Sequence, residues 1–194
     1  DNDATVNIND LTIDVEAGHA ADNGDTFDIQ MGNSVSKLTL AGSESIYVTA
    51  NGLLDSTIVA NGGDTIEGAT TEDTLIATGD NNVLLGNSGD DVLTSTGNNA
   101  SIVAGEGEDL ITATGNNASI DAGVGNDSIA VTGDNASISA NDGVDTITVS
   151  GADNVISGGE DSDAIHVTGG NSTISDLGLG GDGLVVDSNA TVVA

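Results

Sequence analysis

Hydrophobic and polar residues alternate along short segments of the chain, and these segments recur every eighteen residues. The seven-residue segment GEGEDLI at 105–111 recurs as GVGNDSI at 123–129. Three columns of residues keep this period, without an insertion, from residue 55 to residue 180. The first column is Asp55, Asp73, Asp91, Asp109, Asp127, Asp145 and Asp163; the second is Ile66, Leu84, Ile102, Ile120, Ile138, Ile156 and Ile174; the third is Thr78, Thr96, Thr114, Thr132, Ser150 and Thr168. A constant period near twenty indicates a solenoid with one coil per repeat.

We number the positions of a coil from its aspartate. Position 1 holds aspartate, position 3 holds Leu or Ile, and position 5 holds Ala or Val; these positions are expected to point inward and alternate with outward positions 2, 4 and 6. A second alternation contains an apolar residue at position 12 and a small residue at position 14. A period of two predicts β-strands. Because strands of about five residues cannot enclose a globular core, the coils must stack identical residues in columns. The expected fold is all-β, a parallel β-solenoid or β-roll with two short strands per 18-residue coil and a stacked Ile, Leu and Val core.

The beginning of the chain is less regular than the rest. Short alternations near Leu11, Phe27 and Ile46 predict strands, and Leu38 lies one residue out of the downstream register, which predicts a slip or bulge near Gly42. An open solenoid end exposes strand edges and core, so an atypical end coil is expected. We therefore divide the chain into an N-terminal cap with irregular β coils (1–54), a regular solenoid (55–180) and a C-terminal cap or last coil (181–194).

The charge of the chain narrows its possible partners. The net charge is −31, with 32 acidic residues against one basic residue, Lys37. This balance excludes nucleic-acid binding, which needs cationic side chains to neutralise phosphate. It also argues against binding to an anionic membrane surface. Hydrophobic residues make up 37% of the chain and fall in register, which argues against disorder. There is no cysteine for a disulfide, and no segment is long and apolar enough for a transmembrane span.

The aspartate column needs a partner of opposite charge. Stacked coils place inward carboxylates about 4.8 Å apart, where neighbours repel each other by roughly 3.5 kcal/mol at an effective dielectric constant of 20. Either the carboxyl groups are protonated, which an isoelectric point near 4.1 argues against, or a cation lies between them. Carboxylates and flexible glycine carbonyls suit Ca²⁺. The alternative is that the aspartates only cap their turns as Asx-turns.

The segment 123–129 resembles the G-G-x-G-x-D-x-U-x nonapeptide of RTX proteins, whose parallel β-roll binds Ca²⁺. The resemblance covers about residues 86–169 and extends to repeats of bacterial surface-layer and type I-secreted proteins. It implies that the aspartates and turn carbonyls of successive coils share each ion. By resemblance the carboxylate ligands are Asp91, Asp109, Asp127, Asp145 and Asp163, and the turn geometry comes from Gly89, Gly105, Gly107, Gly123, Gly125, Gly143 and Gly159.

The chain departs from the RTX pattern in three ways. The first glycine of the motif is replaced by Ala104, Ala122 and Ala140, and Asn141 replaces the second glycine in one coil. In the opposite turn, the position equivalent to the aspartate holds Ala100, Ala118 and Ala136, next to a column of Asn81, Asn99, Asn117, Asn135, Asp153 and Asn171. Because stacked amides hydrogen-bond to each other without an ion, we predict calcium on one edge of the solenoid and an asparagine ladder on the other.

Other sites are weakly supported. His19 and His166 without cysteine make a zinc site improbable, and no catalytic triad or nucleophile elbow is present. A pair of carboxylates for glycoside hydrolysis is a further alternative. However, the carboxylates form a ladder of equivalent positions, whereas catalysis needs one position that differs from the others. We therefore expect no enzymatic activity. Outward threonine rows resemble ice-binding solenoids, which is a further alternative.

The resemblance implies a bacterial protein that is secreted to the cell surface or medium and folds when it meets calcium outside the cell. The expected function is structural: a subunit or segment of a surface layer, matrix fibre or adhesin that self-associates into a fibre or lattice. The alternative is a calcium-dependent C-terminal module of a type I-secreted hydrolase or toxin.

Overall fold

The computed structural model describes residues 10–15, 27–31, 37–42, 46–50, 57–61, 63–177, 180–186 and 189–193, and in these residues it contains twenty β-strands and no helix. The odd-numbered strands are β1 (Asp10–Val15), β3 (Lys37–Gly42), β5 (Thr57–Ala60), β7 (Thr74–Ala77), β9 (Val92–Ser95), β11 (Leu110–Ala113), β13 (Ser128–Val131), β15 (Thr146–Val149), β17 (Ala164–Val167) and β19 (Gly183–Val186). The even-numbered strands are β2 (Phe27–Met31), β4 (Ile46–Ala50), β6 (Thr65–Glu67), β8 (Val83–Ser88), β10 (Ser101–Glu106), β12 (Ser119–Val124), β14 (Ser137–Asp142), β16 (Val155–Ser157), β18 (Thr173–Asp176) and β20 (Thr191–Val192).

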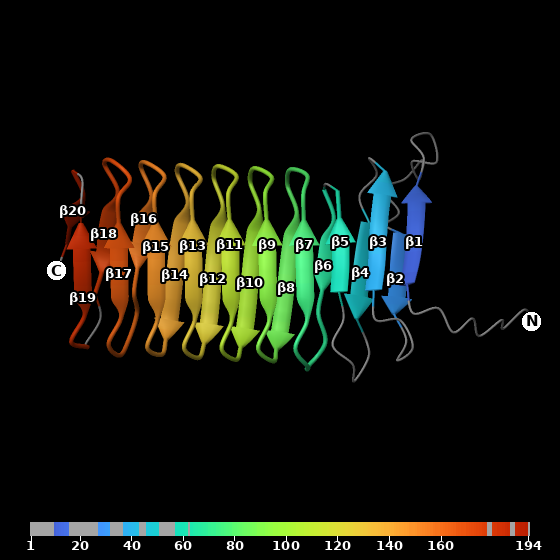
Figure 1. Cartoon of the computed structure of the whole chain (residues 1–194), viewed down its shortest axis with the longest axis horizontal. Coiled ribbons are helices and arrows are strands. Elements are labelled where there is room, and N and C mark those ends of the chain that lie inside the picture. Colours follow the sequence, from blue (N-terminus) through green and yellow to red (C-terminus); the bar gives the residue numbers. More distant parts are fainter. Residues whose placement is uncertain are drawn as a thin grey trace, which may run out of the picture.

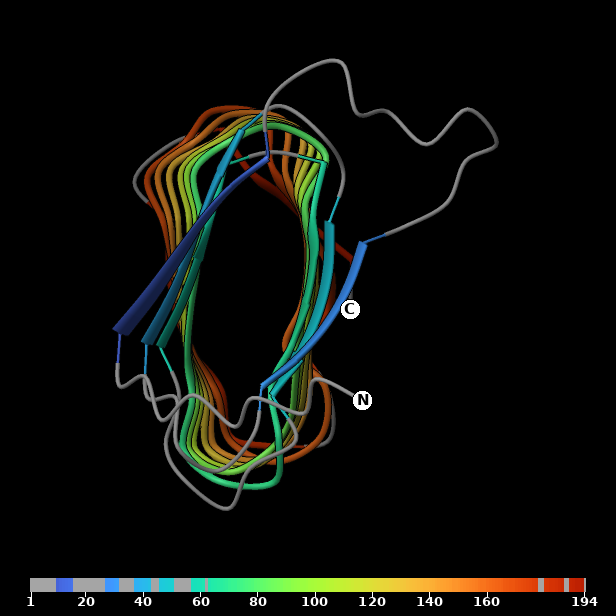
Figure 2. The same ribbon diagram turned by 90° about the vertical axis from the view of Figure 1, so that its right-hand side faces the viewer.

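The strands form two ten-stranded parallel sheets. One sheet has the order β1-β3-β5 through to β19, and we call it the odd-strand sheet; the other has the order β2-β4-β6 through to β20, and we call it the even-strand sheet. Figure 1 shows the coils stacked side by side along one axis, and Figure 2 shows the two sheets facing each other across a flattened ring. The predicted parallel β-solenoid with two strands per coil is confirmed.

The core consists of stacked columns between the two sheets. Strands β11 and β13 alternate between buried and outward residues, and Ile111 pairs with Ile129 at position 3. In the even-strand sheet, Ile102 pairs with Ile120 at position 12, and both are at most 3% exposed. Each buried aliphatic side chain contributes on the order of 1.5–3 kcal/mol, so the columns hold the sheets together.

The period of eighteen is not kept everywhere, contrary to the expectation of an uninterrupted repeat from residue 55 to residue 180. Ile58 pairs with Leu75, one residue short of the period, and Ile165 pairs with Leu184, one residue beyond it. The register also shifts after Ile156. These changes fall next to turns, where the chain can gain or lose a residue without exchanging the inward and outward faces of a strand.

The irregularity expected near Gly42 is also present. Leu38 pairs with Ile58 twenty residues later, whereas Val48 pairs with Ile66 eighteen residues later. The segments between strands β3, β4 and β5 therefore differ in length from their counterparts downstream. Strands β1 to β4 nevertheless belong to the same two sheets as the regular coils. The described part of the early chain thus continues the solenoid.

A column of glycines at position 7 permits the coils to approach closely where odd strands turn back. A Cβ atom on Gly115 would overlap the carbonyl oxygen of Gly97, and one on Gly133 would overlap that of Gly115. Gly97, Gly151 and Gly169 are in the same situation. The need for glycine here is steric, because each glycine faces the backbone of the preceding coil.

Candidate metal centre

The predicted aspartate column forms one edge of the solenoid, which we call the aspartate edge: the turns at 87–91, 105–109, 123–127, 141–145 and 159–163. Each aspartate directly precedes an odd-numbered strand, as Asp109 precedes β11 and Asp127 precedes β13. The alternation of the strand continues into the turn, so position 1 points inward. The side chains of Asp73, Asp91, Asp109, Asp127, Asp145 and Asp163 are at most 2% exposed. Asp55, the first residue of the predicted column, and His19 lie outside the described residues.

One oxygen of each carboxylate is fixed by the neighbouring coil. The backbone N–H of Asp91 donates to Oδ1 of Asp109 at 2.8 Å, and the backbone N–H of Asp109 donates to Oδ1 of Asp127 at 2.8 Å. The same bond joins Asp73 to Asp91, Asp127 to Asp145 and Asp145 to Asp163, at 2.7–2.9 Å. These bonds run between coils, whereas an Asx-turn would close within one coil.

The other oxygen of most of these carboxylates lies in the interior without a partner. Oδ2 is buried and has no hydrogen-bond partner in Asp91, Asp109, Asp127, Asp145 and Asp163. In Asp73, at the start of the regular column, Oδ2 accepts the backbone N–H of Ala69 at 2.6 Å. A buried carboxylate oxygen without a partner is costly when ionised. The five aspartates assigned by resemblance are therefore the five that lack a partner for one oxygen.

Burial disfavours the ionised form of these groups. It raises the pKa of Asp91 and Asp127 to about 7 and that of Asp145 to about 6. The pKa values of Asp109 and Asp163 are also raised, chiefly by burial. Hydrogen bonds from the neighbouring backbone oppose the shift. The isoelectric point near 4.1, which exposed acids dominate, therefore does not report the protonation of the buried aspartates.

The glycines assigned by resemblance have the backbone conformation that the turns need. All seven adopt a positive φ, from 102° to 139°: Gly89, Gly105, Gly107, Gly123, Gly125, Gly143 and Gly159. In the same column as Gly105 and Gly123, the residues Asn87 and Asn141 also have positive φ, which asparagine tolerates better than most residues. The carbonyl oxygen of Gly105 faces Gly123 in the next coil, and that of Gly107 faces Gly125. Backbone carbonyls therefore point along the stack, between successive coils.

These residues fit a hard divalent cation. The aspartate edge supplies buried carboxylate oxygens without partners and carbonyl oxygens between coils, which are the donors that Ca²⁺ prefers. The described residues contain no group of three or more Asp, Glu, His or Cys side chains around one point. Carboxylates of adjacent coils would therefore provide only part of the six to eight oxygens that Ca²⁺ takes, and backbone carbonyls would provide others.

A second ladder at the aspartate edge was not anticipated from the sequence. At position 18, on the outside of the turn, Glu108 donates its backbone N–H to Oδ1 of Asp90 at 2.8 Å. Further along the edge, Val144 donates its backbone N–H to Oδ1 of Asn126, also at 2.8 Å. The signal for this ladder was the recurrence of Asp, Glu and Asn just before the inward aspartate. It fixes the outer turn, and its side chains are exposed.

The opposite edge, which we call the asparagine edge, comprises the turns at 79–82, 97–100, 115–118, 133–136, 151–154 and 169–172. The predicted amide ladder is present: Asn99 Nδ2 donates to Oδ1 of Asn81, and Asn117 Nδ2 donates to Oδ1 of Asn99, both at 3.1 Å. Asn135, Asp153 and Asn171 share the positive φ of this column. An adjacent ladder joins the backbone N–H of Asn116 to Oδ1 of Asn98 at 2.9 Å.

At the inward position of this edge we expected Ala100, Ala118 and Ala136 and no aspartate, but the start of the column contradicts this. The same column contains buried Asp64, Asn82, Asn154 and Ser172. Asp64 donates its backbone N–H to Oδ1 of Asn82 at 3.0 Å, which repeats the bond of the aspartate edge with an amide as acceptor. The signal was in the sequence, because Asp64 and Asn82 lie eighteen residues apart.

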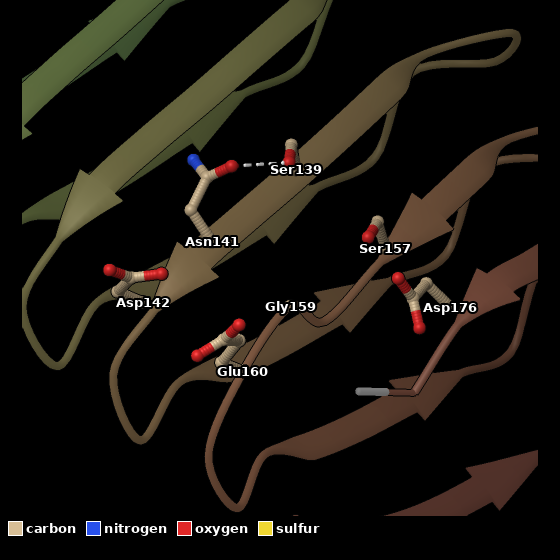
Figure 3. A pocket seen from close by; sticks show the side chains of 7 residues that line it. All are labelled: Ser139, Asn141, Asp142, Ser157, Gly159, Glu160 and Asp176. Atoms are coloured by element: carbon tan, nitrogen blue, oxygen red, sulfur yellow. Dashed lines mark hydrogen bonds between the residues drawn. The ribbon is translucent and has the colours of Figure 1, made fainter. Parts of the chain in front are cut away.

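Two other polar regions belong to the surface. A hollow of about 460 Å³ lies over strands β14, β16 and β18, and Figure 3 shows the acidic side chains of Asp142, Glu160 and Asp176 around it. Ser139 Oγ donates to Oδ1 of Asn141 at 2.8 Å on its rim. The three acidic residues are exposed. His166 is exposed on the outer face of β17 and neighbours Thr148 on β15.

Comparison with known proteins identifies the repeats. The sequence model of the RTX calcium-binding nonapeptide repeat (4 copies) matches residues 58–93, 94–129 and 139–174. Together these segments cover more than half of the chain, and each spans two repeat periods. No curated protein and no solved structure matches the chain. The described part of the chain has no helix with the length and hydrophobicity to cross a bilayer. The chain therefore belongs to the family of RTX calcium-binding nonapeptide repeat proteins, and its parallel solenoid is a calcium-binding β-roll.

Proposed function

We propose that this β-roll is an extracellular structural protein that folds when it binds calcium and then self-associates, as a subunit or segment of a surface layer, matrix fibre or adhesin. The observation that carries the proposal is the column of buried carboxylate oxygens without partners on Asp91, Asp109, Asp127, Asp145 and Asp163. Ionised, these oxygens oppose folding of the metal-free chain. Bound calcium offsets that cost, so binding free energy becomes folding free energy.

Regularity supports a structural role over a catalytic one. The same bond between backbone N–H and Oδ1 repeats from Asp73 to Asp163, and the inward columns of the core repeat with it. An active site needs one position that differs from its neighbours, whereas the aspartates of successive coils have equivalent surroundings. We therefore propose that the protein acts without catalysis.

Membership of the RTX repeat family supports secretion by bacteria, because proteins with these repeats are typically secreted. The chain would remain unfolded at the low calcium concentration inside the cell and fold at the millimolar concentration outside. The same behaviour would serve a calcium-dependent C-terminal module of a type I-secreted hydrolase or toxin. A module of that kind would stay monomeric after folding, whereas a structural subunit would assemble.

The test is to add calcium to the purified chain and to follow assembly by light scattering and electron microscopy. The proposal predicts ordered fibres or sheets at millimolar calcium, and their dissolution by a chelator. Magnesium at the same concentration is the control, because it demands a smaller and more rigid octahedral site. A calcium-folded chain that remains dispersed at every protein concentration would refute the structural role and favour the secreted module.

A further inference from the structure

Five asparagines in one column of the asparagine edge are each followed, two residues later, by a serine or a threonine. They are Asn99, Asn117, Asn135, Asn171 and Asn189, and their triplets read N-A-S three times, then N-S-T and N-A-T. Asn189 belongs to this column, because its carbonyl oxygen accepts the backbone N–H of Asn171 at 2.9 Å. An asparagine with a hydroxyl residue two positions later, and no proline between them, is the acceptor triplet of asparagine-linked glycosylation.

The strands do not require the hydroxyl group of these triplets. Val83 pairs with Ser101, and Val155 pairs with Ser137, at the same outward position of the even-strand sheet. One valine follows Asn81, and the other belongs to the coil in which an aspartate replaces the asparagine. Valine suits an outward strand position at least as well as serine does. The hydroxyl groups beside the five asparagines therefore need an explanation other than strand formation.

The asparagine side chains can carry a sugar without losing their ladder. Asn99, Asn117 and Asn135 are exposed in the turn. A carboxamide nitrogen has two hydrogens, and the ladder uses one of them: Nδ2 of Asn117 donates to Oδ1 of Asn99 at 3.1 Å. A glycosidic bond replaces the second hydrogen and leaves Oδ1 as an acceptor. The ladder and the modification are therefore compatible on the same side chain.

We infer that this column is a row of asparagine-linked glycosylation sites. The donor is a sugar whose anomeric carbon is activated as a diphosphate ester. The bond between the anomeric carbon and the ester oxygen breaks, and a bond between that carbon and Nδ2 forms. The diphosphate leaves with the bonding electron pair, and Nδ2 gives up one proton to a base of the transferase. The inference goes beyond the proposed function, because the modification does not depend on self-association.

The acceptor triplets are concentrated at one edge of the solenoid. The chain contains six of them, and the sixth, Asn126-Asp127-Ser128, lies at the aspartate edge. Its middle residue is Asp127 of the buried column, and the inference does not extend to it. Figure 2 shows the turns of the two edges at opposite ends of the flattened ring. Sugars on the asparagine edge would therefore leave the calcium-binding turns uncovered.

A row of sugars would also affect contacts between copies of the chain. Successive coils are about 4.8 Å apart, so sugars on adjacent coils would stand side by side and project away from the turns. Attached sugars are bulky and hydrophilic, and they would keep the asparagine edge exposed to solvent. The proposed self-association would then use another surface of the solenoid.

The test is tandem mass spectrometry of the chain purified from the cells that produce it naturally. A protease that cleaves at aspartate is used, because Lys37 is the only basic residue and trypsin would leave the column in one fragment. The inference predicts peptides in which Asn135 and Asn171 carry the added mass of at least one hexose or N-acetylhexosamine. Peptides without added mass at all five asparagines would overturn it.

A substitution that keeps the asparagine tests whether the triplet is recognised. Ser137→Val, produced in the same cells, places at position 137 the residue type that the fold already holds at Val155, so the chain should fold in calcium as before. The sugar on Asn135 should fall to background, while the sugar on Asn171 remains. Ser137→Thr should retain both. A sugar that persists on Asn135 in Ser137→Val would overturn the assignment.

The inference and the proposed function fail separately. Circular dichroism of the purified chain with calcium and then with chelator reports folding, and it does not depend on the sugar. A chain that folds with calcium but carries no sugar at the five asparagines refutes only the inference. A glycosylated chain whose strand signal does not respond to calcium refutes only the proposed calcium-dependent folding.

Discussion

The backbone N–H of Asp109 donates a 2.8 Å hydrogen bond to Oδ1 of Asp127 in the next coil, while Oδ2 of Asp127 is buried without a partner. The first oxygen ties the coils together, and the second is left for a proton or a metal ion. A single residue type thus serves both stacking and calcium binding. This division of roles explains why neither a simple turn-capping function nor a purely electrostatic column describes the aspartate edge.

Replacement of one aspartate of the buried column should separate these two roles. Asp127→Asn keeps an oxygen that can accept the backbone N–H of Asp109 but removes the charge. At pH 8 without metal, the free energy of unfolding should rise by about 1–3 kcal/mol, because an uncompensated buried charge is lost. In calcium, the variant should need a higher calcium concentration to fold. The first effect should shift the loss of the metal-free β-strand signal to a higher pH, and a calcium titration at pH 8 measures the second; circular dichroism follows both.

Asp134→Asn is the control for this comparison. Asp134 is exposed on the asparagine edge, and its Oδ1 accepts the backbone N–H of Ala152 at 2.7 Å. The substitution removes the same charge and keeps the same kind of acceptor, so the free energy of unfolding should change by no more than about 0.5 kcal/mol. Equal effects of the two substitutions would show that overall charge, and not the buried column, limits stability.

The metal-free protein should be more stable in mild acid than in mild base. Burial raises the pKa of Asp91 and Asp127 from 3.8 to about 7, so between about pH 4 and pH 7 the folded chain binds more protons than the unfolded chain. Stability therefore falls as pH rises through this interval and levels off above it. In metal-free buffer, the β-strand signal in circular dichroism should be larger at pH 5 than at pH 8. A metal-free strand signal that grows with rising pH would contradict the assigned burial.

Calcium affinity should show the opposite dependence on pH. The ion requires ionised carboxylates, and protonation of Asp127 and its neighbours competes with it as pH falls below about 7. The calcium dissociation constant should therefore be larger at pH 5 than at pH 8. Isothermal titration calorimetry at the two pH values checks this, and an unchanged dissociation constant would indicate that the buried aspartates are not the ligands.

The glycine column at position 7 should be intolerant of any side chain. A Cβ atom on Gly115 would overlap the carbonyl oxygen of Gly97, so Gly115→Ala should reduce the free energy of unfolding by about 2–4 kcal/mol. Gly170→Ala is the matched control, because a Cβ atom there would have no heavy atom within 4 Å. Its effect should be neutral or slightly stabilising. Similar losses for both variants would refute the steric account.

A single substitution in the core should stabilise the protein. The hydroxyl of Ser95 is buried without a hydrogen-bond partner, and Ser95 pairs with Ala77 and Ala113 in the neighbouring coils. Ser95→Ala removes the unsatisfied hydroxyl and completes the alanine column, which should raise the free energy of unfolding by about 1 kcal/mol. Thermal unfolding in calcium measures the change. A loss of stability would mean that the hydroxyl has a partner after all.

The period of the sequence predicts most of the fold because each coil packs only on its neighbours. Ile102 and Ile120 recur at the same position, and stacking then requires that they pair, as they do. The same logic predicts the inward aspartates and the Asn81–Asn99 ladder. Changes in turn length are harder to predict, because the one-residue difference between Ile58 and Leu75 leaves the alternation of both strands unaltered. Asp55 and Asp73 are eighteen residues apart in the sequence, so their spacing gives no sign of this one-residue difference.

The chemistry of the aspartate edge is only partly readable from the sequence. The spacing of Asp109 and Asp127 predicts that their carboxylates stack. It does not say which oxygen the neighbouring backbone occupies, nor how far burial raises the pKa, because both depend on the depth of the side chain within the turn. Asp64 was missed because its column continues with alanine at Ala100 and Ala118, so the polar members at the ends of the column were outweighed by the apolar middle.

The most direct test of the account is far-ultraviolet circular dichroism of the chain at pH 8, first with a chelator and then with increasing calcium. The account predicts a largely unfolded spectrum in chelator, a cooperative gain of β-strand signal on addition of calcium, and its loss when chelator is restored. A chelated chain that shows the full strand signal at pH 8, unchanged by calcium, would contradict the claim that the buried aspartate column needs the metal.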